Sequence, residues 1–232
     1  TLQEIVEATG PLEPARALRV MAQAAEAMIE AHGIGLIHRD IKPANLMLYL
    51  PHEFGIQEAL KVLDFGLVKE TSSGNAGITQ VGTITGTPQY MSPEAIRSPD
   101  TVDARSDIYA LGCVLFYLLT GEHLFTGESP MDVCANHLHA TPDTLSDRLE
   151  VPVDPQLEEL VSACIAKDPA ERLESARKLL ERVEAVEGVG AFTEHDATEW
   201  WAEYAPLFHD EYLPAEQVLT VDIARAGRTP SS

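Results

Sequence analysis

The sequence of 232 residues has few cysteines and few basic residues, and each shortage excludes classes of protein. The cysteines are far apart and have no CxxC or CxxH partner, which favours reduced thiols over a zinc site or a disulfide framework. They are Cys113, Cys134 and Cys164. With 16 Lys and Arg against 37 Asp and Glu, the formal net charge is −21. Direct binding to nucleic acid or to an anionic membrane surface is therefore disfavoured.

The sequence also lacks a long apolar run. None reaches the ~18 residues that a membrane-spanning helix needs, and the first ten residues, TLQEIVEATG, lack the basic and apolar regions of a signal peptide. We therefore expect no membrane segment in this chain and a cytoplasmic location. Because the first residue is not Met, we also expect that the chain begins within a longer protein.

Helical periodicity dominates what is present. From Glu13 onward, apolar residues recur at i, i+3, i+4 and i+7, which predicts an amphipathic helix that ends near Gly33. The run from Asp107 to Thr120, DIYALGCVLFYLLT, is apolar on every face but too short to cross a bilayer. It predicts a buried helix, which Gly121 ends. Further helices are expected around residues 130–138, 155–166 and 174–186, so the fold class is mainly α.

Two short apolar runs, LMLYL and LKVLDFG, flank a loop that contains proline, and together they predict a small β-hairpin. The hairpin would bring Asn45 and Asp64 to the same end. Residues 70–87 are rich in Gly, Ser and Thr and show little periodicity, which predicts a long mobile loop.

Ahead of the hairpin, the stretch LIHRDIKPANLML carries more polar chemistry than a turn requires. Asp40, Asn45 and Asp64 supply hard oxygen ligands that suit Mg²⁺, and the ammonium group of Lys42 complements a phosphate. A carboxylate that does not bind metal can accept the proton of an attacking hydroxyl. The set therefore indicates phosphoryl transfer.

Four motifs occur in order: HRDIKPAN, DFG, GTPQYMSPE and DARSDIYALG. Together they resemble the eukaryotic-type (Hanks-type) Ser/Thr protein kinase family, whose catalytic-loop and DFG patterns they match. The segments KVLDFGLVKE, GTPQYMSPEAI and LLTGEHLF resemble the sequences of the bacterial branch of the family. The resemblance implies a protein-kinase-like C-terminal lobe, in which a helical bundle surrounds a buried central helix and carries a small catalytic β-hairpin.

The resemblance also assigns roles to single residues. Asp40 would orient and deprotonate the substrate hydroxyl, and Lys42 would neutralise the transferring phosphate of ATP. Asn45 and Asp64 would hold Mg²⁺. Lys42 and Thr87 are the residues that family members acting on Ser or Thr show at these positions, which implies protein substrates with Ser or Thr.

Four further residues match structural or regulatory positions of the family. Arg39 resembles the arginine that pairs with a phosphorylated activation loop, and Glu94 and Arg172 resemble a buried ion pair. Asp107 resembles the carboxylate that anchors the catalytic-loop backbone, and we assign His38 to packing. Several loop hydroxyls could accept an activating phosphate that pairs with Arg39. They are Thr71, Ser72, Ser73, Thr79, Thr83 and Thr85.

The expected organisation is a partial kinase domain over residues 1–187 and an acidic tail over 188–232, with one short helix around EHDATEWWAEY. Trp200 and Trp201 in that helix are expected to anchor it on the lobe surface, and the tail could dock partners. A glycine-rich loop and a lysine strand like VAIK do not occur in the sequence, so the N-terminal β lobe is missing from it. The fragment alone is expected to be inactive or nearly so.

Two alternatives remain open. A small-molecule phosphotransferase would share the Asp, Asn and metal-Asp pattern, but GTPQYMSPE resembles a loop that docks peptide substrates. A non-catalytic scaffold or pseudokinase-like binding module would use the helical lobe only to recruit partners. An open reading frame that begins upstream with a glycine-rich strand would favour the enzyme over the scaffold.

Overall fold

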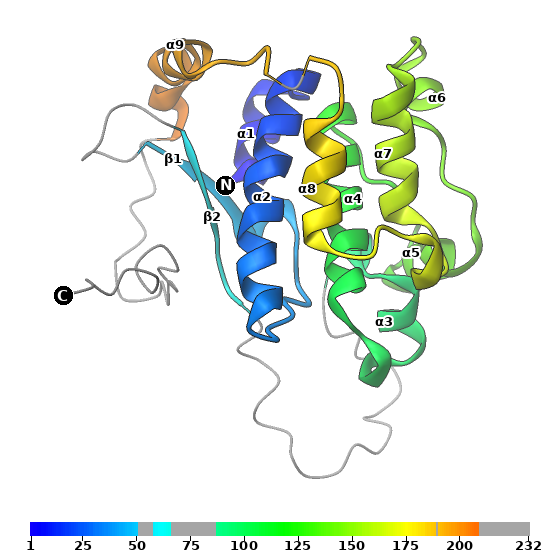
Figure 1. The fold of residues 1–232 in the computed structure, drawn as a ribbon. Helices are drawn as coiled ribbons and strands as arrows, with labels where there is room; N and C mark the ends of the chain where they lie inside the picture. The colour runs from blue at the N-terminus through cyan, green and yellow to red at the C-terminus, as the bar shows by residue number, and fades with distance from the viewer. Residues whose placement is uncertain (51–57, 66–86, 189, 209–232) are drawn as a thin grey trace, which may run out of the picture.

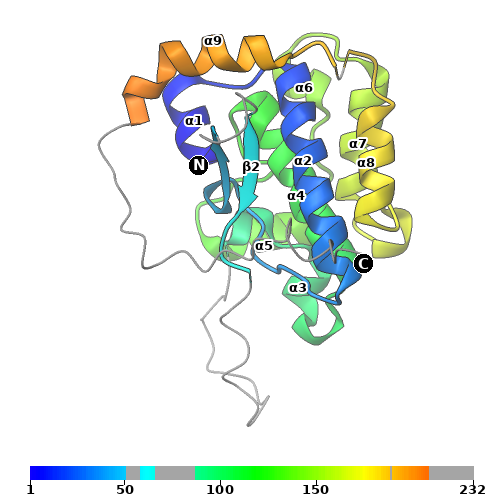
Figure 2. The same cartoon turned by 60° about the vertical axis from the view of Figure 1, so that its left-hand side comes forward.

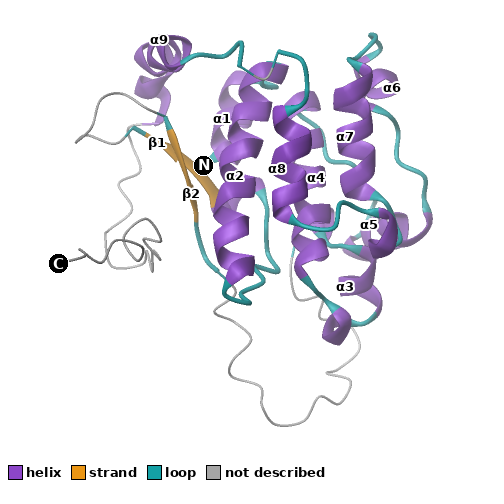
Figure 3. Cartoon of the chain, in the orientation of Figure 1, coloured by secondary structure: helices purple, strands orange, loops and turns teal. Residues whose placement is uncertain are grey.

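The computed structural model describes residues 1–50, 58–65, 87–188 and 190–208, and these residues are mainly helical (Figures 1 and 3). The longer helices are α1 (Leu2–Thr9), α2 (Pro14–Gly33), α4 (Ala104–Thr120), α5 (Pro130–His139), α7 (Pro155–Ile165), α8 (Ala176–Glu184) and α9 (Glu194–Tyr204). The short elements are α3 (Pro93–Arg97), α6 (Leu145–Leu149) and the strands β1 (Leu46–Tyr49) and β2 (Ala59–Val62). Single 3-10 turns cover Pro43–Asn45, Pro88–Tyr90, Pro99–Thr101, Pro169–Glu171 and Ala205–Phe208. The prediction of a mainly α fold with one small hairpin is confirmed.

Helix α4 forms the centre of the molecule and contacts α2, α7 and α8 (Figure 1). Every residue from Ser106 to Leu119 is buried, as its uniformly apolar sequence predicts. Gly121 ends the helix in the left-handed conformation, with φ of 75°. At Gly112 a Cβ atom would lie 2.6 Å from Cβ of Cys164, so the absence of a side chain there lets α4 and α7 pack closely.

Helix α2 places its apolar face against α4 and α8 and also contacts strand β2. Pro14 stands in its first turn, where a missing N–H costs nothing, and Leu18, Met21 and Met28 are among its buried residues. The helix ends at Gly33, as the periodicity predicts. Together α1 to α8 and the hairpin form what we call the helical body.

The hairpin pairs β1 with β2 in antiparallel register, with Leu46 opposite Val62 and Tyr49 opposite Ala59. Along β1 buried residues alternate with less buried ones, as expected for a strand with one face on a core. The loop between the strands, residues 51–57, and most of the long loop predicted at residues 70–87 lie outside the described residues. None of the described helices combines the length and apolar character needed to cross a membrane.

The short helix expected in the tail is α9, which begins with a capping box between Thr193 and Asp196. The helix returns to the helical body, and the side chains of Trp200, Trp201 and Phe208 pack against its core. In Figure 2 α9 crosses the end of the molecule where α2 begins.

Candidate active site

The segment between α2 and β1 is held by hydrogen bonds to Asp107 in the first turn of α4. Asp107, which is 1% exposed, accepts hydrogen bonds from the backbone N–H groups of His38 and Arg39, at 2.9 Å each. Arg39 has φ of 68°, a left-handed conformation that costs a non-glycine residue roughly 1 kcal/mol or more. The two bonds to a charged acceptor hold the backbone in that conformation.

His38 joins this segment to the end of the hairpin. Its ring is fully buried, and Nε2 lies 2.8 Å from the carbonyl oxygen of Leu63. The backbone N–H of Asp40 donates to Nδ1 at 3.3 Å, so Nε2 must carry the ring proton and donate it to Leu63. The ring also packs against Phe65, with centroids 4.7 Å apart. His38 therefore packs, as assigned, and in addition ties together two segments that sequence reasoning treated separately.

Two side chains named from the sequence contact Asp40, and one of them also reaches Thr87. The ammonium group of Lys42 lies 2.8 Å from Oδ2 of Asp40 and donates to the hydroxyl of Thr87 at 3.1 Å. The amide nitrogen of Asn45 donates to the carbonyl oxygen of Asp40 at 2.8 Å and to its Oδ2 at 3.2 Å. The side chains of Asp40 and Lys42 are 37% and 24% exposed, so the cluster is accessible from solvent.

Asp64 stands at the same end of the hairpin. The backbone N–H of Leu63 donates to the carbonyl oxygen of Asn45 at 2.8 Å, which extends the pairing by one step and places residue 64 just beyond it. Asp64 is exposed and has φ of 54°. Within the described residues its carboxylate makes no hydrogen bond to Lys42 or Asn45, so the structure joins the neighbouring backbone of Leu63, but not the side chain of Asp64, to that cluster.

The donor set fits a divalent cation that also binds phosphate. Because Nδ2 of Asn45 is committed to Asp40, the carbonyl oxygen of the same carboxamide is the atom left to meet a cation. The exposed carboxylate of Asp64 is a second hard oxygen donor. Mg²⁺ commonly takes one or two protein oxygens and completes its shell with water and substrate phosphate.

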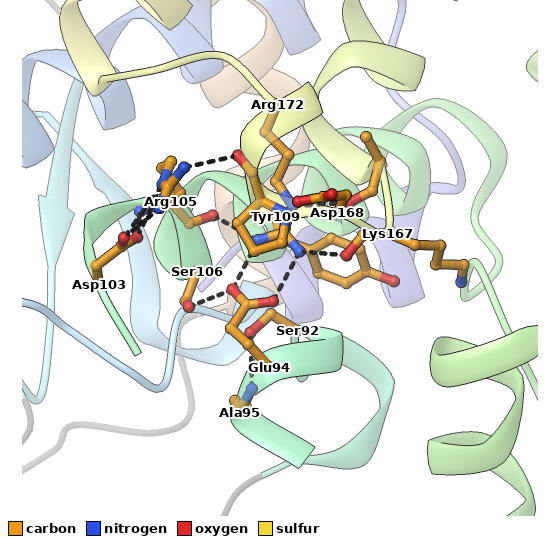
Figure 4. A network of polar contacts seen from close by, with 12 residues as sticks. Ser92, Glu94, Ala95, Asp103, Arg105, Ser106, Tyr109, Lys167, Asp168 and Arg172 are labelled. Atoms are coloured by element: carbon orange, nitrogen blue, oxygen red, sulfur yellow. Dashed lines mark hydrogen bonds and ion pairs between the residues drawn. The ribbon is translucent and has the colours of Figure 1, made fainter. Parts of the chain in front are cut away.

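Glu94 and Arg172 form an ion pair beneath the segment that follows the long loop. Both oxygens of Glu94 accept from the guanidinium group at 2.7 Å, and Figure 4 shows Glu94 facing both Arg172 and Ser106. Burial raises the pKa of Glu94, but the hydrogen bonds from Arg172 and Ser106 outweigh it, so the pKa lies below its ordinary value. The carboxylate therefore stays charged at neutral pH.

Sequence reasoning missed two further polar contacts. Nε2 of His32 lies 2.8 Å from Oδ2 of Asp107, so a third group converges on the carboxylate that accepts from the backbone of His38 and Arg39. Arg16 and Glu58 form a buried ion pair at 2.7 Å. No pattern pointed to either, because the partners lie 75 and 42 residues apart in the chain. The six loop hydroxyls named as phosphate acceptors lie outside the described residues.

Comparison with known proteins adds independent findings. A family model of the protein kinase domain matches residues 1–183. The serine/threonine-protein kinase PknB of Mycobacterium tuberculosis (strain ATCC 25177 / H37Ra) is 42% identical over 179 residues, which cover 77% of this chain and 27% of PknB. The serine/threonine-protein kinase pkn3 of Myxococcus xanthus is 37% identical over 189 residues, which cover 80% of this chain and 34% of pkn3. The chain thus spans about a third or less of the length of these curated relatives.

Proposed function

This chain belongs to the protein kinase family, in its bacterial serine/threonine branch, and on that premise we propose that it forms the helical lobe of an enzyme that transfers the γ-phosphate of ATP to Ser or Thr hydroxyls of proteins. The observation that carries the proposal is the contact cluster of Asp40, Lys42, Asn45 and Thr87. Four residues from two separate motifs meet there on a solvent-accessible surface.

Asp40 is the group that accepts the proton of the substrate hydroxyl. Its carboxylate is partly exposed, and the amide of Asn45 and the ammonium of Lys42 both donate to Oδ2, which fixes its orientation. A positioned general base contributes roughly 10²- to 10⁴-fold in rate. Because Asn45 donates to both the backbone oxygen and the side chain of Asp40, the carboxylate has little rotational freedom to lose when substrate binds.

Lys42 connects the base to the segment that begins at Thr87. Its ammonium group reaches both Asp40 and the Thr87 hydroxyl, and in the proposal it neutralises the charge of the transferring phosphate. In the proposal Asn45 and Asp64 hold Mg²⁺, which would supply charge neutralisation at the phosphates of ATP. Residues 1–187 form the lobe and residues 188–232 the tail.

The test uses the full-length protein, incubated with labelled ATP, Mg²⁺ and a generic protein substrate. We expect Asp40→Asn and Asp64→Ala each to lower the initial rate of phosphate incorporation by about 100-fold or more. The matched control is Asp100→Asn, an exposed aspartate away from the cluster, which should retain the wild-type rate. Equal rates for Asp40→Asn and wild type would contradict the proposal and favour the non-catalytic scaffold.

The isolated chain of residues 1–232 provides a second comparison. Its sequence contains neither a glycine-rich phosphate loop nor a lysine strand like VAIK, so we propose that it transfers phosphate slowly or not at all. Transfer by this chain at the rate of the full-length protein would show that the described residues suffice for catalysis.

A further inference from the structure

The tail helix α9 makes specific polar contacts with the helical body. The indole N–H of Trp201 donates to Oε1 of Glu58 at 2.9 Å. The ring of the neighbouring Trp200 lies over the guanidinium group of Arg16, with 3.8 Å between the guanidinium carbon and the ring centroid. The matched kinase domain ends at residue 183, so these contacts come from a segment outside the match.

Arg16 and Glu58 are buried charges that depend on their surroundings. The two residues are 2% and 3% exposed, and their charged groups are 2.7 Å apart. Moving such ions out of water costs several kcal/mol for each ion unless further hydrogen bonds compensate. Burial lowers the pKa of Arg16, and the charge of Glu58 opposes that shift. The hydrogen bond from Trp201 is such a compensating contact, and the ring of Trp200 adds a cation–π contact to Arg16; both are supplied by α9.

The same ion pair fixes the start of strand β2. Glu58 directly precedes the strand, and the backbone N–H of Leu60 donates to Oε1 of Gln23 at 2.8 Å. Arg16 and Gln23 are seven residues apart on α2 and therefore lie on one face of that helix. Two side chains of α2 thus hold the carboxylate of Glu58, just before the strand, and the backbone N–H of Leu60 within it, and α9 contacts that carboxylate.

The other end of β2 leads into the candidate metal site. After Val62, the backbone N–H of Leu63 donates to Asn45 and its carbonyl oxygen accepts from His38. Asp64 follows at once. The strand has only four residues, so Glu58 and Asp64 lie at the two ends of one short extended segment.

We propose that α9 is part of the catalytic apparatus, with Trp201 acting as a positioning residue that holds Glu58, and through strand β2 sets the place of Asp64. The proposal rests on the proposed function, in which Asp64 holds Mg²⁺. It extends the functional unit beyond the matched kinase domain into the tail.

The test compares Trp201→Phe with Trp200→Phe in the full-length protein. Both variants replace an indole with a phenyl ring, but of the two tryptophans only Trp201 donates a hydrogen bond through its N–H within the described residues. Two quantities are measured well below the thermal transition: amide hydrogen exchange at Leu60 and Leu63, and the Mg²⁺ concentration that gives half the maximal rate. For Trp201→Phe we expect about tenfold faster exchange, the factor that corresponds to losing a hydrogen bond to a charged group. We also expect a several-fold higher Mg²⁺ requirement with a smaller change in kcat.

Phenylalanine at position 200 keeps an aromatic ring beside Arg16 and removes no hydrogen bond to Glu58, so Trp200→Phe should change both quantities less than Trp201→Phe does. Unchanged exchange in Trp201→Phe, or equal acceleration in both variants, would overturn the role of Trp201. Faster exchange with an unchanged Mg²⁺ requirement would show that α9 stabilises the strand without positioning Asp64, and would also overturn the proposal. If wild type transfers no more phosphate than Asp64→Ala, the proposed function fails, whereas the contact between α9 and β2 is still decided by the exchange measurement.

Discussion

Replacing Arg172 with alanine should lower the free energy of unfolding by about 3 to 5 kcal/mol, because it leaves a largely buried carboxylate without its cation. The side chain of Arg172 is fully buried, and its partner Glu94 is 13% exposed. Both oxygens of that carboxylate accept from the guanidinium group at 2.7 Å. The variant therefore tests whether this pair holds the segment after the long loop against the helical body.

The structure shows which hydrogen bonds the Arg172→Ala variant would lose. A guanidinium group has five N–H donors, and all five are used. Two reach Glu94, and the other three reach the carbonyl oxygens of Arg105, Ala166 and Lys167 at 3.0, 2.7 and 3.2 Å. Alanine leaves each of these acceptors to find another donor in a site that admits little water. Arg172→Lys offers three donors instead of five and keeps the charge, so its loss should be smaller but measurable.

The assay is urea unfolding of the chain at neutral pH, followed by circular dichroism. Arg182→Ala serves as the matched control, because Arg182 pairs with Glu159 at 2.9 Å on the surface, where the two side chains are 35% and 68% exposed. An exposed pair contributes about 1 kcal/mol or less. A loss for Arg172→Ala no larger than that for Arg182→Ala would refute the reasoning that burial makes the first pair indispensable.

Three further predictions concern the close packing at Gly112, the titration of His137 and the hydrogen bonds of Asp107. Gly112→Ala should lower the free energy of unfolding by about 1 to 3 kcal/mol, since its Cβ would lie 2.6 Å from Cβ of Cys164. Gly33→Ala should not, because a Cβ there would have nothing within 4 Å. Melting temperatures from differential scanning fluorimetry compare the two variants. Burial lowers the pKa of His137 from 6.5 to about 4, so below pH 6.5 the unfolded chain binds a proton that the folded chain does not. Stability should fall by about 2 kcal/mol from pH 7 to pH 5, and urea midpoints of His137→Gln should lack this component. Asp107→Asn should lower the phosphate-transfer rate of the full-length protein, because an amide has a single acceptor oxygen and its NH2 group cannot accept from the second backbone N–H; a wild-type rate would contradict this.

Local pattern was sufficient for most of the secondary structure. The helix that begins after Glu13 ends at Gly33, and the buried helix ends at Gly121, as their sequences predict. Both results depend on interactions within a few residues, namely apolar periodicity and the conformational freedom of glycine. The hairpin was predictable for the same reason, since two apolar runs joined by a short loop pair with each other by proximity.

The site was predictable only in part. Motif spacing identified Asp40, Lys42 and Asn45, which lie within one short segment. The contact between Lys42 and Thr87 spans 45 residues, and nothing local requires it. The packing of His38 against Phe65 and its bond to Leu63 likewise needed the hairpin to be folded onto the segment before it.

The sequence by itself determined the helices, the hairpin and the residue types of a phosphate-handling cluster, because each depends on short-range periodicity or on motif spacing. Only the tertiary structure decided that Arg16 meets Glu58 and that the tail supplies Trp201 to the same carboxylate, 143 residues away. Because removing a charge from water is costly, a buried charge needs a partner within hydrogen-bonding distance. The packing of whole elements decides which group lies that close.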